Sequence, residues 1–187
     1  MKLTFPFLVF FCCLLAFSCS DDEETRRDAD LNYDAENFSA PQFTNVTFEA
    51  GVRFPAVLTA NFAGQQLTEV EFYMMDVPSS TELLIYGPGS PSTPAGTPIY
   101  QVDLTTDIGA NRWNNHILTT PVDITGEDLW INVRVTHNGD VQSVGCDAGP
   151  ATQNGDWISL DNGGWRTLRN FSNDDVDINW NIRGFVE

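Results

Sequence analysis

Apolar and polar side chains alternate strictly over residues 129–136, and this period of two constrains the fold more than any other feature of the sequence. The apolar positions are Leu129, Ile131, Val133 and Val135. The positions between them are Trp130, Asn132, Arg134 and Thr136. Because successive side chains of an extended chain point to opposite faces of a sheet, the pattern predicts a β-strand with one face against a core.

The C-terminal segment shows a similar alternation. Its apolar side consists of Ile178, Trp180, Ile182 and Val186. Its other side, which is mostly polar, consists of Asn179, Asn181, Arg183 and Phe185. One-sided alternation of this kind is typical of antiparallel sheets, in which one face packs on the core and the other faces outward.

Short apolar stretches recur from Phe38 onward, and Gly, Pro, Asn and Asp separate them. Strands are expected at residues 67–75, 82–86, 98–104, 112–119, 128–137, 141–146, 156–160, 165–168 and 178–186. About nine strands, with turn signals every 8 to 12 residues or so, predict an all-β fold, a two-sheet antiparallel β-sandwich of jelly-roll type. The proline-rich stretch from Gly87 to Gly96 cannot support ladder hydrogen bonds and predicts a long loop, a candidate lip for a binding site.

The N-terminus predicts export. Lys2 precedes an apolar run, Leu8 to Phe17, that is too short to cross a bilayer as a helix, so residues 1–18 are predicted to be a signal peptide. It ends in Leu14-Leu15-Ala16-Phe17-Ser18-Cys19, which resembles the lipobox of bacterial lipoproteins, where the cysteine is lipidated. Cys19 is therefore the predicted membrane anchor. Ordinary signal cleavage with release is the alternative.

An acidic run, Asp21-Asp22-Glu23-Glu24, follows this cysteine. Such a run stays solvated, yet Cys, Ser and several acidic residues also resemble the surface-export signal of lipoproteins in one large phylum of Gram-negative gut and oral bacteria. The resemblance implies an outer-membrane lipoprotein that faces the cell exterior, with a periplasm-facing anchor as the alternative. Residues 19–36 are expected to form a flexible acidic tether, and residues 37–187 a single β-sandwich domain.

The charge of the chain is strongly negative. Nine Lys and Arg residues stand against 26 Asp and Glu residues, a formal net charge of −17. Removal of residues 1–18 takes away Lys2, the only lysine, and lowers the charge by one to −18. Such a surface repels polyanions, and no basic patch interleaved with aromatic residues occurs, so we expect no nucleic-acid partner.

The residue types that commonly act in catalysis do not form a recognisable active-site motif in this sequence. Cys146 is the only cysteine after residue 19, so the domain has no intramolecular disulfide, and a small buried side chain is expected there. His116 and His137 fall on different predicted strands without metal-ligand spacing. No nucleophile elbow or phosphate-binding loop is present. These features predict a protein that is not an enzyme.

Several short motifs follow one another in an order that resembles a known family. They are Leu129-Trp130-Ile131, Asp147-Ala148-Gly149-Pro150, Gly155-Asp156-Trp157-Ile158-Ser159-Leu160, Gly163-Gly164-Trp165 and Asn179-Trp180-Asn181-Ile182-Arg183. Over about residues 67–187 the chain resembles the cleaved-adhesin or haemagglutinin domains attached to gingipain-type proteases, and related choice-of-anchor modules. The resemblance implies a non-catalytic jelly roll, similar to carbohydrate-binding modules and used in adhesion. This chain departs from the family context because no protease domain accompanies the module.

The resemblance also implies a structural calcium ion. Calcium requires six to eight oxygen ligands, and Asp147 and Asp156 are the candidate ligands because they lie in the family-like motifs. Further acidic residues of nearby loops are Asp161, Asp174, Asp175 and Asp177. The spacing has no EF-hand order, and the alternative is that these carboxylates cap turns.

The candidate ligand site lies on the polar side of the two alternating strands. A sugar ring packs against an exposed aromatic face while amides or Arg bond its hydroxyls, and Trp130, Asn132 and Arg134 supply that set. If the last strand lies nearby, its residues extend the site; these are Asn179, Asn181 and Arg183. The alternative is that a loop or the second sheet covers Trp130. The other four tryptophans are expected in the core or in turn packing.

These features lead to one main hypothesis, a cell-surface lipoprotein whose jelly roll recognises a glycan or mediates adhesion. The alternative from another class is a protein-interaction or structural module of an outer-membrane or adhesive assembly. An uncharacterised hydrolase is the third hypothesis.

Overall fold

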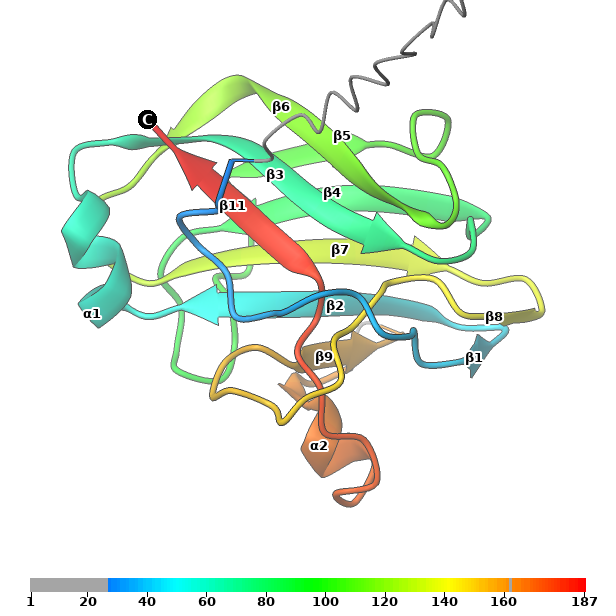
Figure 1. Cartoon of the computed structure of the whole chain (residues 1–187). Coiled ribbons are helices and arrows are strands. Elements are labelled where there is room, and N and C mark those ends of the chain that lie inside the picture. The colour runs from blue at the N-terminus through cyan, green and yellow to red at the C-terminus, as the bar shows by residue number, and fades with distance from the viewer. Residues whose placement is uncertain (1–26, 162) are drawn as a thin grey trace, which may run out of the picture.

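Two antiparallel sheets packed face to face form the body of the structure, a computed structural model that describes residues 27–161 and 163–187 (Figure 1). The larger sheet has the strand order β10-β9-β2-β7-β4-β5. Its strands are β2 (Thr47–Phe54), β4 (Ser80–Tyr86), β5 (Tyr100–Asp103), β7 (Leu129–Thr136), β9 (Trp157–Leu160) and β10 (Arg166–Thr167). The smaller sheet, β11-β3-β6, contains β3 (Gln66–Met74), β6 (Arg112–Asp123) and β11 (Ile182–Val186). The predicted all-β, two-sheet antiparallel sandwich is confirmed.

The core lies between the two sheets and is built from the apolar sides of the alternating strands. Leu129, Ile131, Val133 and Val135 of β7 are all buried in it. Partners from both sheets include Val52 of β2, Phe72 of β3 and Ile182 of β11. Because β7 pairs with β2 on one side and β4 on the other, its apolar side chains occupy the centre of this layer.

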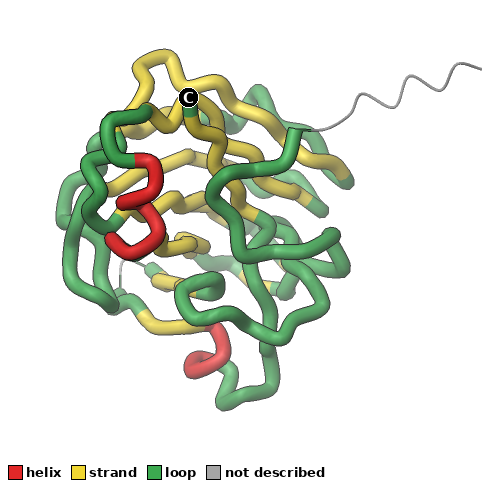
Figure 2. Tube along the Cα trace, turned by 60° about the vertical axis from the view of Figure 1, so that its left-hand side comes forward, coloured by secondary structure: helices red, strands yellow, loops and turns green. Residues whose placement is uncertain are grey.

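Two short helical segments lie at the edges of the sandwich (Figure 2). The first, α1 (Ala56–Thr59) with the 3-10 turn η1 (Ala60–Phe62), follows β2. The second, α2 (Leu168–Phe171), follows β10. Thr167 is its N-cap, and the side chain of Thr167 accepts a hydrogen bond from the backbone N–H of Asn170. A small two-stranded sheet pairs β1 (Phe43–Thr44) with β8 (Asp140–Val141). In the described part of the chain, no helix has the length and apolar character needed to cross a membrane.

Some strand predictions require correction. Strand β2 was not expected, although Phe48, Ala50 and Val52 carry the same alternation as β7. In the expected strand 141–146, only its first residue belongs to a regular strand, and Val144 and Cys146 make isolated bridges. The last strand begins at Ile182 rather than four residues earlier. Cys146 itself is buried, as expected, and it is a free cysteine among the described residues.

The predicted tether boundary is wrong, because residues 27–36 pack on the domain. Leu31 is buried and pairs with Gly184 of β11, through N–H to O distances of 3.0 and 2.8 Å. Asp34 is also buried and forms an ion pair with Arg183. This segment therefore extends the smaller sheet at its β11 edge. The predicted signal peptide, residues 1–18, and the predicted anchor Cys19 lie outside the described residues.

Candidate functional site

The predicted aromatic platform is not exposed, because Trp130 has 0% of its surface accessible. Trp157 and Trp165 cover it, with ring centroids 5.4 and 5.7 Å from that of Trp130. Trp130 forms a small second cluster with Leu84 and Tyr86 on the outer side of the larger sheet. The polar side of β7 near Trp130 is therefore packed under a third layer, and the prediction of a ligand platform at Trp130 is wrong.

The polar neighbours of Trp130 on β7 are also engaged within the protein. Asn132 is buried and donates a hydrogen bond to Oε1 of Glu49 at 2.7 Å. Arg134 lies between two carboxylates, 2.8 Å from Glu49 and 3.3 Å from Glu82. Both Asn132 and Arg134 thus bond to a carboxylate on a neighbouring strand, which makes this row a cross-strand network of the sheet.

The last strand does not extend that row, because β11 belongs to the other sheet. Asn181 and Arg183 both donate hydrogen bonds to Asp34 of the N-terminal segment. The guanidinium of Arg183 also lies 4.0 Å from the ring centroid of Trp113. Asn179 is buried and organises the loop before β9. The structure therefore does not bring the six predicted ligand residues together.

The two predicted calcium ligands have different roles in loops. Asp147 accepts hydrogen bonds from the backbone N–H groups of Ala35, Gly149 and Asn179, and from the side chain of Asn179. Asp156 accepts one from the backbone N–H of Arg169. Across residues 27–161 and 163–187, no three His, Cys, Asp or Glu side chains are grouped so that they could hold a metal ion. Calcium binding stays a prediction, which melting in calcium and in chelator would test.

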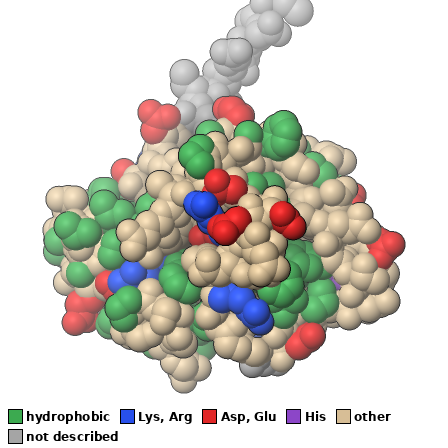
Figure 3. Space-filling view, turned by 90° about the horizontal axis from the view of Figure 1, so that it is seen from below, with side chains coloured by type: hydrophobic (Ala, Val, Ile, Leu, Met, Phe, Trp, Pro, Cys, Tyr) green, Lys and Arg blue, Asp and Glu red, His purple; other side chains and the backbone are tan. Residues whose placement is uncertain are grey.

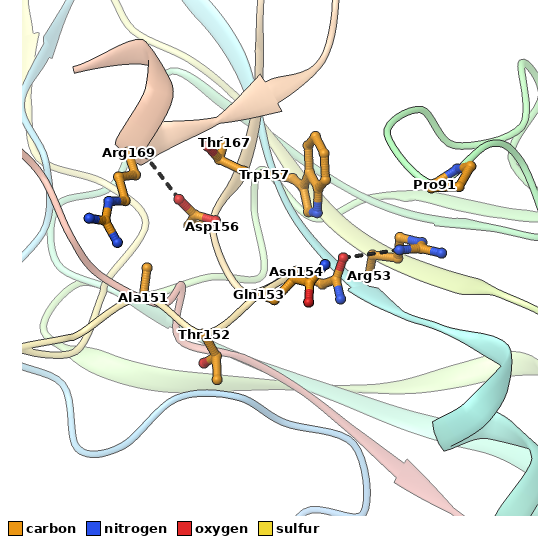
Figure 4. A pocket seen from close by; sticks show the side chains of 10 residues that line it. All are labelled: Arg53, Pro91, Ala151, Thr152, Gln153, Asn154, Asp156, Trp157, Thr167 and Arg169. Carbon is orange, nitrogen blue, oxygen red and sulfur yellow. Dashed lines mark hydrogen bonds between the residues drawn. The ribbon is translucent and has the colours of Figure 1, made fainter. Parts of the chain in front are cut away.

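A pocket of about 490 Å³ opens beside the β9 end of the larger sheet (Figure 4). Its walls come from β2, the proline-rich loop, the loop before β9, and the β9–β10–α2 segment. The lining residues are Arg53, Pro91, Ala151, Thr152, Gln153, Asn154, Asp156, Trp157, Thr167 and Arg169. We call this cavity the Trp157 pocket.

Trp157 is the aromatic wall of this pocket. It is the first residue of β9, it is partly exposed, and its indole stands between Thr167 and Pro91 in the view of Figure 4. The back of the indole packs on Trp130, which fixes its orientation. A rigid, partly exposed aromatic ring beside amide and hydroxyl groups is the arrangement that sugar-binding pockets use.

Arg53 and Asn154 fix the polar side of the pocket. The guanidinium of Arg53 donates to Oδ1 of Asn154 at 3.0 Å, and the two residues are also joined through their backbones at 3.0 Å. Asn154 has a φ of 81°, a left-handed conformation that asparagine tolerates better than most residues. Tyr33 donates a hydrogen bond to the carbonyl of Arg53 at 2.7 Å. The pocket wall is therefore held from three segments.

Asp156 contributes a carboxyl group that is almost fully buried in the wall. Burial raises its pKa above the usual range for Asp, and the nearby charge of Asp177 acts in the same direction. The hydrogen bond from the backbone N–H of Arg169 acts against this increase. The pocket therefore disfavours negative charge at Asp156.

The sequence predicts one edge of this pocket. The proline-rich loop is the expected binding lip, and Pro91 of that loop lines the cavity. Trp157 was expected in the core or in turn packing, and Arg53 and Asn154 were not among the predicted site residues. The signal that could have found Trp157 was its place at the end of a short strand, directly after the polar loop Thr152-Gln153-Asn154.

His116, His137 and Cys146 each have surroundings within the domain that can be described. Nε2 of His137 lies 2.7 Å from Oγ of Ser143, but both residues are buried. Nε2 of His116 lies 2.7 Å from the hydroxyl of Tyr100. Burial raises the pKa of the Cys146 thiol to about 12, which keeps it protonated at neutral pH.

No protein-family model matches the chain, and the search of curated proteins found no match. Among solved structures, the structure of this chain is similar to the crystal structure of the cysteine protease and lectin-like domains of Cwp84, a surface layer associated protein of Clostridium difficile. The superposition has a TM-score of 0.52 at 12% sequence identity, and it covers 81% of this chain but 36% of the other. The match falls on the lectin-like region. At this identity the similarity shows a shared fold alone.

Proposed function

We propose that this chain is a cell-surface lipoprotein whose β-sandwich is a non-catalytic glycan-binding module, and that the Trp157 pocket is its binding site. The observation that carries the proposal is the composition of this cavity. A partly exposed indole faces the donors and acceptors of Arg53, Gln153 and Asn154 within a volume of about 490 Å³. Saccharides are bound by such a combination, because the ring packs on the indole while side-chain amides and guanidinium bond the hydroxyls.

The fold supports the proposal independently of the pocket. The shared fold with a lectin-like region of a bacterial surface protein fits a binding module better than an enzyme. The motif order that resembles cleaved-adhesin domains points to the same class of protein. In this proposal, lipid on Cys19 anchors the chain in the outer membrane with the domain toward the exterior.

A glycan array probed with the purified protein tests the proposal, followed by calorimetric titration of each oligosaccharide that binds. Trp157→Ala should weaken binding by at least about tenfold, since central aromatic contacts carry most of the energy of such sites. Trp113→Ala is the matched control, because Trp113 is a partly exposed tryptophan of the other sheet. Retained binding by Trp157→Ala, or equal loss in both variants, would remove the pocket from the proposal.

A second candidate function, a protein-interaction module, is favoured by one observation. Strand β6 is twelve residues long and lies at the edge of the smaller sheet, and its Ile117 is 71% exposed. Such an edge can accept a strand from another protein. Recovery of a stoichiometric envelope protein with the wild-type chain, but not with Ile117→Lys, would support this function.

A further inference from the structure

The charges around the Trp157 pocket restrict which saccharides it can take. Arg53 is the first of its two arginines, and its guanidinium is already neutralised. Nε and Nη2 of Arg53 donate to Oδ2 of Asp128 at 2.8 and 2.6 Å. The two side chains are only 11% and 16% exposed, so solvent weakens this ion pair little.

The second arginine of the pocket, Arg169, is about half exposed, and it too is paired with carboxylates. Its Nε donates to Oδ1 of Asp174 at 2.7 Å, and its Nη1 lies 3.7 Å from Oδ1 of Asp177. A third nearby arginine, Arg166, is not a lining residue and lies over the ring of Phe171, 5.1 Å from its centroid. The pocket therefore offers N–H donors without an unpaired positive charge.

Carboxylates outnumber arginines at this site. Asp128, Asp174 and Asp177 pair with the two arginines, and Asp156 adds a fourth carboxyl group in the wall. Figure 3 views the molecule from the end that carries α2, and acidic side chains there adjoin the basic ones. The chain as a whole carries a formal net charge of −17. Any anionic ligand approaches against this field.

Arg53 can still bond a neutral ligand. A guanidinium has five N–H donors, and three of those of Arg53 are used by Asp128 and Asn154. One N–H therefore remains on each of Nη1 and Nη2. Two adjacent donors suit neighbouring hydroxyl or carbonyl oxygens, which need no countercharge.

From this charge pattern, and resting on the proposed function, we infer that the Trp157 pocket selects uncharged saccharides and rejects those with sialic acid, uronic acid or sulfate groups. A neutral ring loses only hydroxyl hydration on entry, which the free N–H groups and the amides replace. An anionic group would lose its hydration without meeting an unpaired cation. It would also be repelled by the carboxylate of Asp128, which is paired with Arg53. The raised pKa of Asp156 agrees with this, because the site already disfavours a negative charge of its own.

The test is an array on which neutral oligosaccharides are printed beside their charged counterparts, such as lactose beside sialyllactose and sulfated lactose. The wild-type protein should bind neutral members at least about tenfold more tightly than their anionic counterparts. Its affinity for a neutral member should not change when sodium chloride is raised, since no charge is neutralised on binding. Preference for the anionic members would overturn the inference and leave the proposed function standing. An array without any binding would overturn both.

Asp128→Asn gives a second, sharper measurement. It removes the carboxylate that neutralises Arg53, so the preference for neutral over anionic members should narrow by about tenfold. Asp107→Asn makes the same change of charge at a residue that neither lines the pocket nor pairs with Arg53, and should leave the preference unchanged. An equal effect of both substitutions would show that net charge, rather than the Arg53–Asp128 pair, sets the preference, and would contradict the inference. If Asp128→Asn does not fold, the wild-type array and salt dependence still decide.

Discussion

Arg183 of β11 forms an ion pair with Asp34 of the N-terminal segment, in which Nη2 of Arg183 lies 2.8 Å from Oδ2 of Asp34. The side chain of Asp34 has no exposed surface, and that of Arg183 is 14% exposed. Burial raises the pKa of Asp34, while the hydrogen bonds from Arg183 and Asn181 oppose this increase. The pair joins the beginning of the described chain to its last strand.

Asp34→Ala should lower the free energy of unfolding by about 3 to 5 kcal/mol, because it leaves the largely buried guanidinium of Arg183 without its partner. Urea unfolding of the purified protein measures the change. Glu36→Ala is the control, since Glu36 is exposed in the same segment. Equal stability of the two variants would mean that residues 27–36 add little to the domain.

Gly51→Ala should destabilise the protein by about 1 to 3 kcal/mol, the usual cost of overpacking. A Cβ atom at this position would lie 2.5 Å from Oδ1 of Asn132 and 3.1 Å from the ring of Trp165. Gly96→Ala is the matched control, because a Cβ atom there meets nothing within 4 Å. Thermal melting of both variants should show a loss only for the first. A stable Gly51→Ala variant would argue against the packing of Trp165 over β2.

Trp130→Ala should cost about 3 to 5 kcal/mol of stability, the range for a buried aromatic residue in a core. The reason is that Trp130 lies under Trp157 and Trp165 and does not reach solvent. Denaturant unfolding provides the measurement. A Trp130→Ala variant with wild-type stability but no glycan binding would instead support the sequence-based prediction that Trp130 is an exposed ligand platform.

Asp156→Asn should make stability less dependent on pH. The pKa of Asp156 is raised in the native state above its ordinary value of 3.8, so the native state holds this proton more tightly than the unfolded chain. The residue therefore costs stability as pH rises through the raised pKa. The free energy of unfolding of the variant, relative to wild type, should increase as pH rises above 3.8.

Asp103→Asn supplies a contrast of opposite sign. Hydrogen bonds from Thr105 lower the pKa of Asp103, so its ionised form stabilises the native state above 3.8 and this contribution is lost as pH falls. Relative to wild type, this variant should therefore lose stability as pH rises. Parallel pH profiles for the two variants would contradict both assignments.

Much of the fold could be predicted because the alternation along β7 is a local property of the chain. The burial of Leu31 could not be predicted, since it depends on Gly184, which is far away in the sequence. A Cβ atom at Gly184 would lie 2.8 Å from Leu67 and 3.4 Å from Leu31. Only this close approach lets the N-terminal segment pair with β11, and no periodicity of residues 27–36 reports it.

The site was harder to predict for a related reason. A period of two shows which side chains share a face, but not whether another layer covers that face. Trp130 and Asn132 do share a face, as expected, but Trp165 from a distant loop lies over it. The residues that form the pocket come from β2, β9, β10, α2 and two loops. Their meeting depends on strand order, which is not visible in the spacing of the sequence.

The packing of residues 27–36 on β11 also determines how far the domain could stand from a membrane. If lipid holds Cys19, seven residues lie between it and Arg27, a span of at most about 28 Å when fully extended. A tether running to residue 36 would reach roughly twice as far. The described chain begins at the opposite end of the molecule from β9 and α2 (Figures 1 and 2). The Trp157 pocket would therefore lie on the side of the domain that is remote from the point where the tether joins it.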